Sequence, residues 1–157
     1  MVKIKILLGI ITLLIVVYIL HFLSYFFLAD YFAEISKSTE SKIVFGKYNL
    51  VIGLIQSIVI FFGLIISFKC MYEIIKRGFF TKTSKKLMYV AGIIFLFSGL
   101  VALSLDSIRL FNSANQGTLI GILFMDFLLA LIGFIILIIS EMSCIGFEIK
   151  SENDLTI

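Results

Sequence analysis

The chain alternates between four long apolar runs and shorter polar segments. The apolar runs cover residues 6–28, 50–68, 87–105 and 117–140. About 20 apolar residues in a helix cross the hydrocarbon core of a bilayer, so each run is long enough to span it. The chain contains no proline, so no run loses a backbone donor to this residue. The pattern predicts an all-α membrane protein: four transmembrane helices in an up-and-down bundle, forming a single domain over residues 1–157 with a tail at 141–157.

Small and polar residues recur at helical spacing within these runs and predict the faces that pack together. In the fourth run this face comprises Asp126, Ala130, Gly133, Leu137 and Ser140. In the third run it comprises Gly92, Ser98, Gly99, Ala102 and Asp106, and in the second Asn49, Gln56, Gly63 and Ser67. The fourth run also opens with a GxxxG pattern, Gly117 to Gly121, which is a weak signal because it is common in apolar helices.

Composition excludes an ordinary soluble domain. Hydrophobic residues make up 61% of the chain, charged residues only 15%, and the mean hydropathy is +1.18. The first run could instead belong to a secretory signal peptide, but it is longer than the apolar core of such a peptide. It also lacks a convincing small-residue cleavage site before Asp30, so we interpret it as a span.

The basic residues are clustered, and the clustering predicts the orientation. Six of the 13 Lys and Arg residues lie between the second and third runs: Lys69, Lys76, Arg77, Lys82, Lys85 and Lys86. With four spans, nine basic residues fall on the side of the termini and four on the opposite side. Cytoplasmic segments are enriched in Lys and Arg, so we expect both termini in the cytoplasm, and we attribute the cluster to topology rather than to nucleic-acid binding.

Four polar residues fall at similar predicted depths and form a candidate intramembrane polar cluster: Asp126, His21, Gln56 and Arg109. A carboxylate within hydrocarbon is costly unless it meets protein or water, so Asp126 needs a partner. Two interpretations remain open: a polar pocket for a small molecule or a proton-sensing pair, and an interhelical clasp that fixes packing. We favour the clasp.

No recognisable catalytic or cofactor-binding pattern occurs in the chain. His21 is the single histidine, so a haem or zinc site would lack convergent ligands. Cys70 and Cys144 are too far apart in sequence for a CxxC motif, and we expect reduced thiols. No nucleophile elbow, phosphate-binding glycine loop or zinc-protease helix is present. We therefore expect neither an enzyme nor a bound cofactor.

Two stretches carry a resemblance to a known family. The chain ends in Glu-Asn-Asp-Leu-Thr-Ile over residues 152–157, and residues 72–80 read Tyr-Glu-Ile-Ile-Lys-Arg-Gly-Phe-Phe. In both stretches the chain resembles a family of uncharacterised bacterial four-span membrane proteins. The resemblance implies a bacterial cell-membrane protein without established activity. Members of the family are often encoded beside a small helix-turn-helix DNA-binding protein, which implies a membrane-bound partner for a cytoplasmic regulator.

Two hypotheses on function follow. The first is binding of such a regulator, without direct contact to nucleic acid, through a cytoplasmic interaction surface. Its candidate residues are Lys76, Arg77, Lys82, Lys85, Lys86, Glu148, Glu152 and Asp154. The same charges could instead be only a topology signal and a solvated tail. The alternative function is a small transporter or channel subunit with a polar site around Asp126, which would require a homo-oligomer because four short spans enclose little water.

Overall fold

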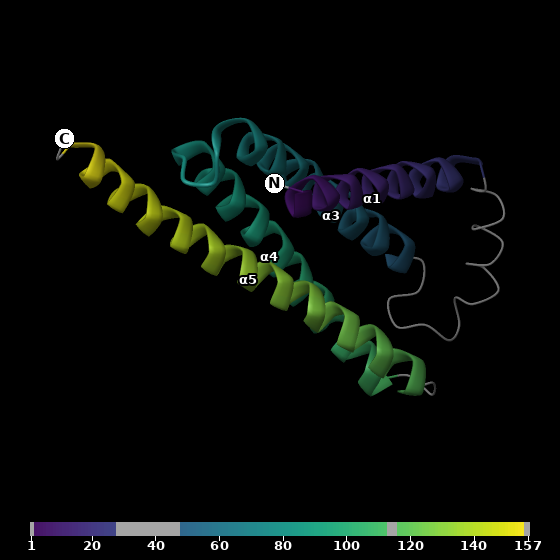
Figure 1. Cartoon of the computed structure of the whole chain (residues 1–157). Helices are drawn as coiled ribbons and strands as arrows, with labels where there is room; N and C mark the ends of the chain where they lie inside the picture. The colour runs from purple at the N-terminus through teal and green to yellow at the C-terminus, as the bar shows by residue number, and fades with distance from the viewer. Residues whose placement is uncertain (1, 28–47, 113–115, 156–157) are drawn as a thin grey trace.

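The computed structural model describes residues 2–27, 48–112 and 116–155, and these residues form four helices joined by one described turn (Figure 1). The helices are α1 (Val2–Phe27), α3 (Tyr48–Arg77), α4 (Lys82–Asn112) and α5 (Gln116–Leu155). Each contains a stretch long and apolar enough to cross a membrane. The predicted all-α membrane protein with four transmembrane helices is confirmed. The polar segment between the first and second apolar runs falls almost entirely outside the described residues.

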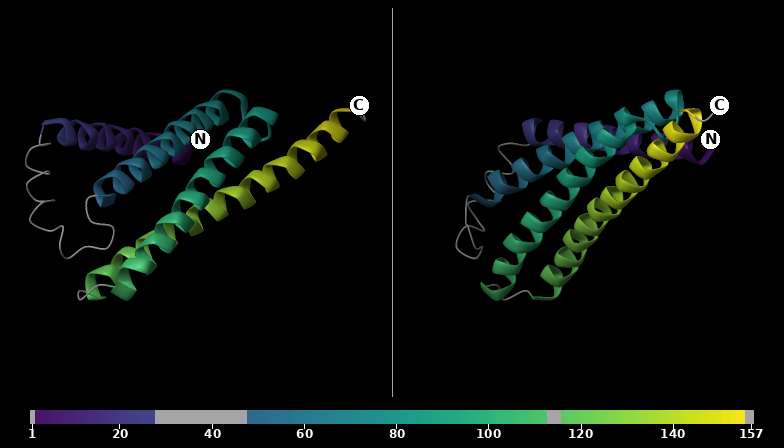
Figure 2. Two further views of the ribbon diagram at one scale, coloured as in Figure 1. Left: turned by 180° about the vertical axis from the view of Figure 1, so that it is seen from behind. Right: turned by 90° about the vertical axis from the view of Figure 1, so that its left-hand side faces the viewer.

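The helices pack in the order of the chain. Within the described residues, α1 packs against α3, α3 against α4, and α4 against α5, whereas α1 and α5 make no close approach to each other. Figures 1 and 2 show consecutive helices running in alternating directions, with α4 and α5 as a long antiparallel pair and α1 crossing α3. The up-and-down bundle therefore has two outer helices, α1 and α5, that leave one side open between them.

The small-residue faces predicted for the third and fourth runs form the interface between α4 and α5. A Cβ atom added to Gly99 would lie 2.8 Å from Cα of Ala130, and one added to Gly133 would lie 2.7 Å from Cα of Leu96. Side chains at these glycines would collide with the opposite backbone, so the absence of a Cβ lets the two helices approach closely. By contrast, a Cβ on Gly121 meets nothing within 4 Å, so this half of the GxxxG pattern contributes no close packing.

The turn between α3 and α4 is built by a glycine and a capping threonine. Gly78 has a φ of 93°, which L side chains rarely adopt, and its N–H donates to the carbonyl of Ile74 over 3.0 Å, ending α3. Thr81 precedes the first residue of α4, and its Oγ1 accepts a 3.1 Å hydrogen bond from the N–H of Ser84. Helix α3 therefore ends before this glycine, and α4 begins directly after Thr81.

The C-terminal segment is a continuation of helix α5. Helix α5 continues to Leu155, well past the predicted end of the fourth span at Ser140. Ser143 and Gly146, on this continuation, pack against the turn after α3, through the carbonyl of Phe79 and the ring of Phe80. These tertiary contacts support helical structure beyond the apolar run, which composition alone did not indicate.

Candidate functional site

Asp126 lies in the α4–α5 interface beside a second acid and a base. Asp126 is 8% exposed and Asp106, across the interface on α4, is 6% exposed. The side chains of Asp106 and Arg109 lie near enough to Asp126 for their charges to act on its carboxyl group. Arg109 also forms an ion pair with Asp106 through Nη1 and Oδ1, one turn apart on α4. The site is therefore a triad of Asp106, Arg109 and Asp126 in which both acids are buried and Arg109 is partly exposed.

This triad holds two acids against one fixed positive charge. Two carboxylates close together repel each other when both are ionised, so burying these acids depends on a compensating positive charge. The ion pair of Asp106 with Arg109 supplies such a charge, which lowers the cost of burial. Oδ2 of Asp126 is buried and has no hydrogen-bond partner among the described residues. The triad can therefore hold α4 and α5 together through polar groups inside the apolar interface.

The other two residues predicted at this depth lie on different helices. His21 is exposed on α1, where its ring lies edge-on to Tyr18 with 6.3 Å between centroids and 6.0 Å from Phe22. Gln56 is half-buried on α3. Neither α1 nor α3 approaches α5 closely within the described residues. The structure thus brings Arg109 to Asp126 and adds Asp106, while His21 and Gln56 occupy the α1–α3 half of the molecule.

A second group of predicted residues lies where the turn after α3 meets α5. Nζ of Lys85 lies 2.6 Å from Sγ of Cys144, and this sulfur lies 3.4 Å from Oε1 of Glu148. The ammonium of Lys82 stands 5.7 Å from the centre of the Phe147 ring. Together with Thr81 these residues line a surface cleft of about 340 Å³. The basic segment and the acidic end of the chain, considered separately in the sequence, thus share one surface.

Buried serines fix this surface in place. Oγ of Ser143 donates to the carbonyl of Phe79 and Oγ of Ser140 to that of Lys85, both over 3.0 Å. Ser84, on the first turn of α4, is fully buried and donates to the carbonyl of Gly78 over 3.4 Å. A hydroxyl is small enough to enter a tight helix interface and still satisfy a backbone carbonyl there. The turn and α5 therefore form one packed unit.

The remaining predicted surface residues surround this unit. Arg77 pairs with Glu73 one turn earlier on α3, with 3.2 Å between Nε and Oε2. Lys76 and Lys86 are exposed, and Glu152 is exposed on the projecting end of α5. The side chain of Asp154 lies outside the described residues.

Several residues of both sites were not assigned these roles from the sequence. Asp106 was assigned to a packing face, but not to the neighbourhood of Asp126. Cys144 and Phe147 lie in the second cleft, and their spacing with Glu148 along one helical face was the available signal. Cys70 is also a free thiol, and it is buried against Ile74 and Met88.

The fold and these sites define an α-helical membrane protein that crosses the bilayer several times. The family described as a protein of unknown function, DUF2975, matches residues 24–157, and the chain belongs to this family. The matched region contains α3, α4 and α5, and leaves out most of α1. No curated protein and no solved structure matches the chain. The family description names no activity, so function has to be argued from the sites.

Proposed function

We propose that this protein is the membrane-bound partner of a cytoplasmic helix-turn-helix transcriptional regulator. In this proposal the chain lies in the bacterial cell membrane with both termini in the cytoplasm. The excess of nine basic residues over four on the side of the termini supports this orientation. The regulator then meets the turn after α3 and the C-terminal part of α5.

One observation carries the proposal: the basic turn after α3 and the acidic end of α5 together form one surface with a cleft in it. Lys82 and Lys85 contact Phe147 and Cys144 at its centre. Segments that served only as a topology signal and a solvated tail would not need buried serines to hold them together. A rigid surface that mixes both signs of charge with an aromatic ring suits the selective recognition of another protein.

The end of α5 adds an exposed helical segment to this surface. Figure 1 shows the C-terminal end of α5 projecting past the turn that joins α3 to α4. Glu148, Ser151 and Glu152 are exposed on this projecting segment. Such a segment offers acidic side chains to a basic partner, and a DNA-binding protein contacts DNA through basic residues. Ion pairs between these basic residues and the acids of α5 would hold the regulator away from DNA.

Co-purification from membranes tests the proposal. The tagged full chain should retain the helix-turn-helix protein encoded beside its gene, and a Glu148→Lys, Glu152→Lys double variant should lose it. Glu141→Lys changes an exposed acid on the same helix that does not line the cleft, so this control should still retain the regulator. Loss of the regulator from all variants equally, or from none, contradicts the proposal.

The triad supports a second candidate, a small transporter or channel subunit that assembles as a homo-oligomer. Its supporting observation is that two buried acids, Asp106 and Asp126, lie near each other in the α4–α5 interface, because acidic residues inside membranes occur in proton relays. Vesicles containing the chain should then show a proton flux that Asp126→Asn abolishes. Equal flux through both proteins, or no flux above that of empty vesicles, contradicts this candidate.

A further inference from the structure

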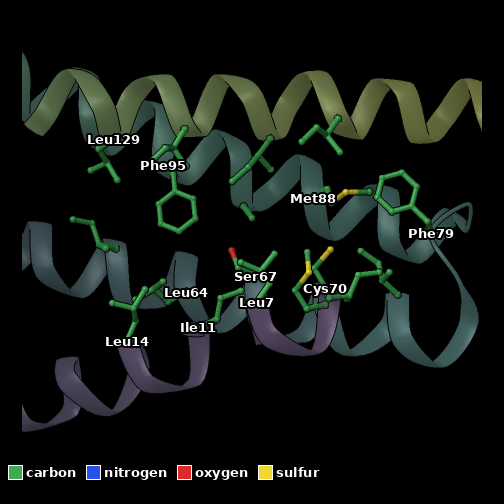
Figure 3. Close-up of a pocket in the computed structure, with 18 residues that line it drawn as sticks. Leu7, Ile11, Leu14, Leu64, Ser67, Cys70, Phe79, Met88, Phe95 and Leu129 are labelled. Atoms are coloured by element: carbon green, nitrogen blue, oxygen red, sulfur yellow. The ribbon is translucent and has the colours of Figure 1, made fainter. Parts of the chain in front are cut away.

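An apolar groove lies on the open side of the bundle, between the two outer helices. Its volume is about 570 Å³, within the range of roughly 300–1,000 Å³ typical of ligand sites. All four helices line it, with Leu7 and Leu14 from α1, Leu64 from α3, Phe95 from α4 and Leu129 from α5. Figure 3 shows these side chains facing one another across the groove. The hydroxyl of Ser67, also in the lining, is satisfied by the carbonyl of Gly63 over 2.8 Å.

The groove covers about half of the membrane thickness. Its lining runs from Ile4 to Leu14 on α1 and from Leu129 to Ile139 on α5, a rise of about 15 Å on each helix at 1.5 Å per residue. The hydrocarbon core of a bilayer is about 30 Å thick, so one leaflet contributes roughly 15 Å. The groove therefore matches the depth reached by the acyl chain of a single lipid.

Basic residues lie at one end of the groove. Lys3 and Lys5 are exposed and flank Ile4, which lines the groove at this end. Lys76 is exposed on α3 two residues after the lining residue Ile74, whereas the charge of Arg77 is compensated by Glu73. The exposed acid Glu141 follows Ile139 on α5 and balances part of this charge. At the other end, the groove is lined by the apolar residues Leu14, Ile60 and Leu129.

We propose that this groove binds one acyl chain of an anionic phospholipid, with the lipid phosphate beside Lys3 and Lys5. The lipid enters sideways between α1 and α5, because these helices make no close approach to each other. Anionic lipids concentrate in the leaflet facing the cytoplasm, where basic residues beside a span attract them. The site thus selects its lipid by the headgroup and holds it by the apolar lining.

A transmembrane helix from a second copy fits this groove less well than an acyl chain. A second copy in the same membrane orientation would bring its own basic residues toward Lys3 and Lys5, where like charges repel.

Photolabelling of the full chain in vesicles tests the proposal. The chain is reconstituted in phosphatidylcholine vesicles that contain a small amount of photoactivatable phosphatidylglycerol, and in parallel vesicles with photoactivatable phosphatidylcholine. Mass spectrometry then locates the labelled peptides. We expect phosphatidylglycerol to label the groove residues more strongly, on the order of tenfold for two lysines near the headgroup. Equal labelling by the two lipids, or cross-links between two copies through the groove, would overturn the proposal.

A matched pair of variants separates the groove from the outer surface of the same helix. Ile132 and Ile138 are both on α5 and are 50% and 44% exposed, but only Ile132 lines the groove. Ile132→Trp should reduce groove labelling severalfold, and Ile138→Trp should leave it unchanged. The double variant Lys3→Gln, Lys5→Gln alters exposed residues only and should remove the preference for phosphatidylglycerol. Equal effects of both tryptophans, or an unchanged preference in the lysine variant, would contradict the site.

Discussion

Gly133 of α5 lies directly against the backbone of Leu96 on α4, at a distance that leaves no room for a side chain. A Cβ at this position would stand 2.7 Å from Cα of Leu96, and it would meet backbone atoms that cannot move aside as a flexible side chain can. The close packing of α4 on α5 therefore requires a residue without a side chain at position 133. Close contact of backbones is a principal source of stability between helices in lipid, where hydrophobic driving force is absent.

Gly133→Val should therefore lower the free energy of unfolding by about 1–3 kcal/mol, because the two helices must separate to admit the side chain. Titration with SDS, followed by circular dichroism, measures this change. The control is Gly121→Val on the same helix, where an added Cβ meets nothing within 4 Å. If both variants unfold at the same SDS content, the proposed close packing of α4 on α5 is wrong.

Substitutions in the triad should differ in their cost. Asp126→Asn keeps the shape and a hydrogen-bonding group while removing one of two neighbouring acids, so stability should stay the same or rise. Asp106→Asn instead takes the ion-pair partner from Arg109, which is largely buried, and should be the more destabilising of the two. The same SDS titration gives the order. A larger loss from Asp126→Asn would mean that Asp126 carries the essential charge.

Replacing Asp126 by leucine tests the clasp interpretation separately. Leucine cannot hydrogen-bond Asp106, so we expect a loss of about 1–3 kcal/mol in unfolding free energy compared with Asp126→Asn. Equal stability of the leucine and asparagine variants would show that the contact with Asp106 contributes nothing to the fold.

The serine contacts that join α5 to the turn should be measurable in the same way. Ser143→Ala leaves the carbonyl of Phe79 without its 3.0 Å hydrogen bond and should cost about 1 kcal/mol. Ser104→Ala is the control, because the exposed Ser104 hydroxyl bonds only within its own helix. Its effect should stay within about 0.5 kcal/mol. Protease cleavage after residue 146 should also become faster in Ser143→Ala, and unchanged cleavage would indicate that α5 does not depend on the turn.

Two glycine-to-alanine substitutions in and beside α3 should have opposite signs. Gly78 has a φ of 93°, so Gly78→Ala should destabilise the protein by about 1–2 kcal/mol. Gly53 lies inside α3 with nothing within 4 Å of an added Cβ, so Gly53→Ala should stabilise it by about 0.5–1 kcal/mol. Thermal unfolding in detergent compares them, and a shift of the same sign for both would contradict the helix end at Gly78.

The packing faces could be predicted from the sequence, because small residues at helical spacing have few other roles in an apolar run. Ala130, Gly133 and Ser140 are buried in the α4–α5 interface as their spacing indicated. Gly63 is also buried, beneath the ring of Phe95, as the polar face of the second run predicted. These positions follow from local periodicity alone.

The composition of the polar site could not be predicted in full. Depth along a helix follows from residue number, but which helices are neighbours does not. His21 and Gln56 have depths similar to that of Asp126, yet they lie on α1 and α3, which do not approach α5 closely. The contact of Asp106 with Asp126 depends on how α4 and α5 are offset along their axes. That offset is set by the close contacts at Gly99 and Gly133, which spacing within one helix cannot give.

The length of α5 was missed for a related reason. The residues after Ser140 become polar, which is typical of a chain that leaves the membrane. Their helical structure rests on tertiary contacts of Ser143 with Phe79 and of Gly146 with Phe80. No sequence pattern within residues 141–155 predicts that these residues contact Phe79 and Phe80.

The orientation in the membrane is the claim on which the regulator surface and the lipid groove both depend. Reporter fusions measure it most directly: green fluorescent protein placed after Ile157, and alkaline phosphatase inserted near Ser41. Green fluorescent protein fluoresces when it is made in the cytoplasm, whereas alkaline phosphatase is active only after export. The basic end of the bundle in the cytoplasm predicts a fluorescent C-terminal fusion and an active phosphatase at Ser41. A dark C-terminal fusion together with an inactive phosphatase at Ser41 would contradict the orientation, and with it the assignment of both sites to the cytoplasmic side.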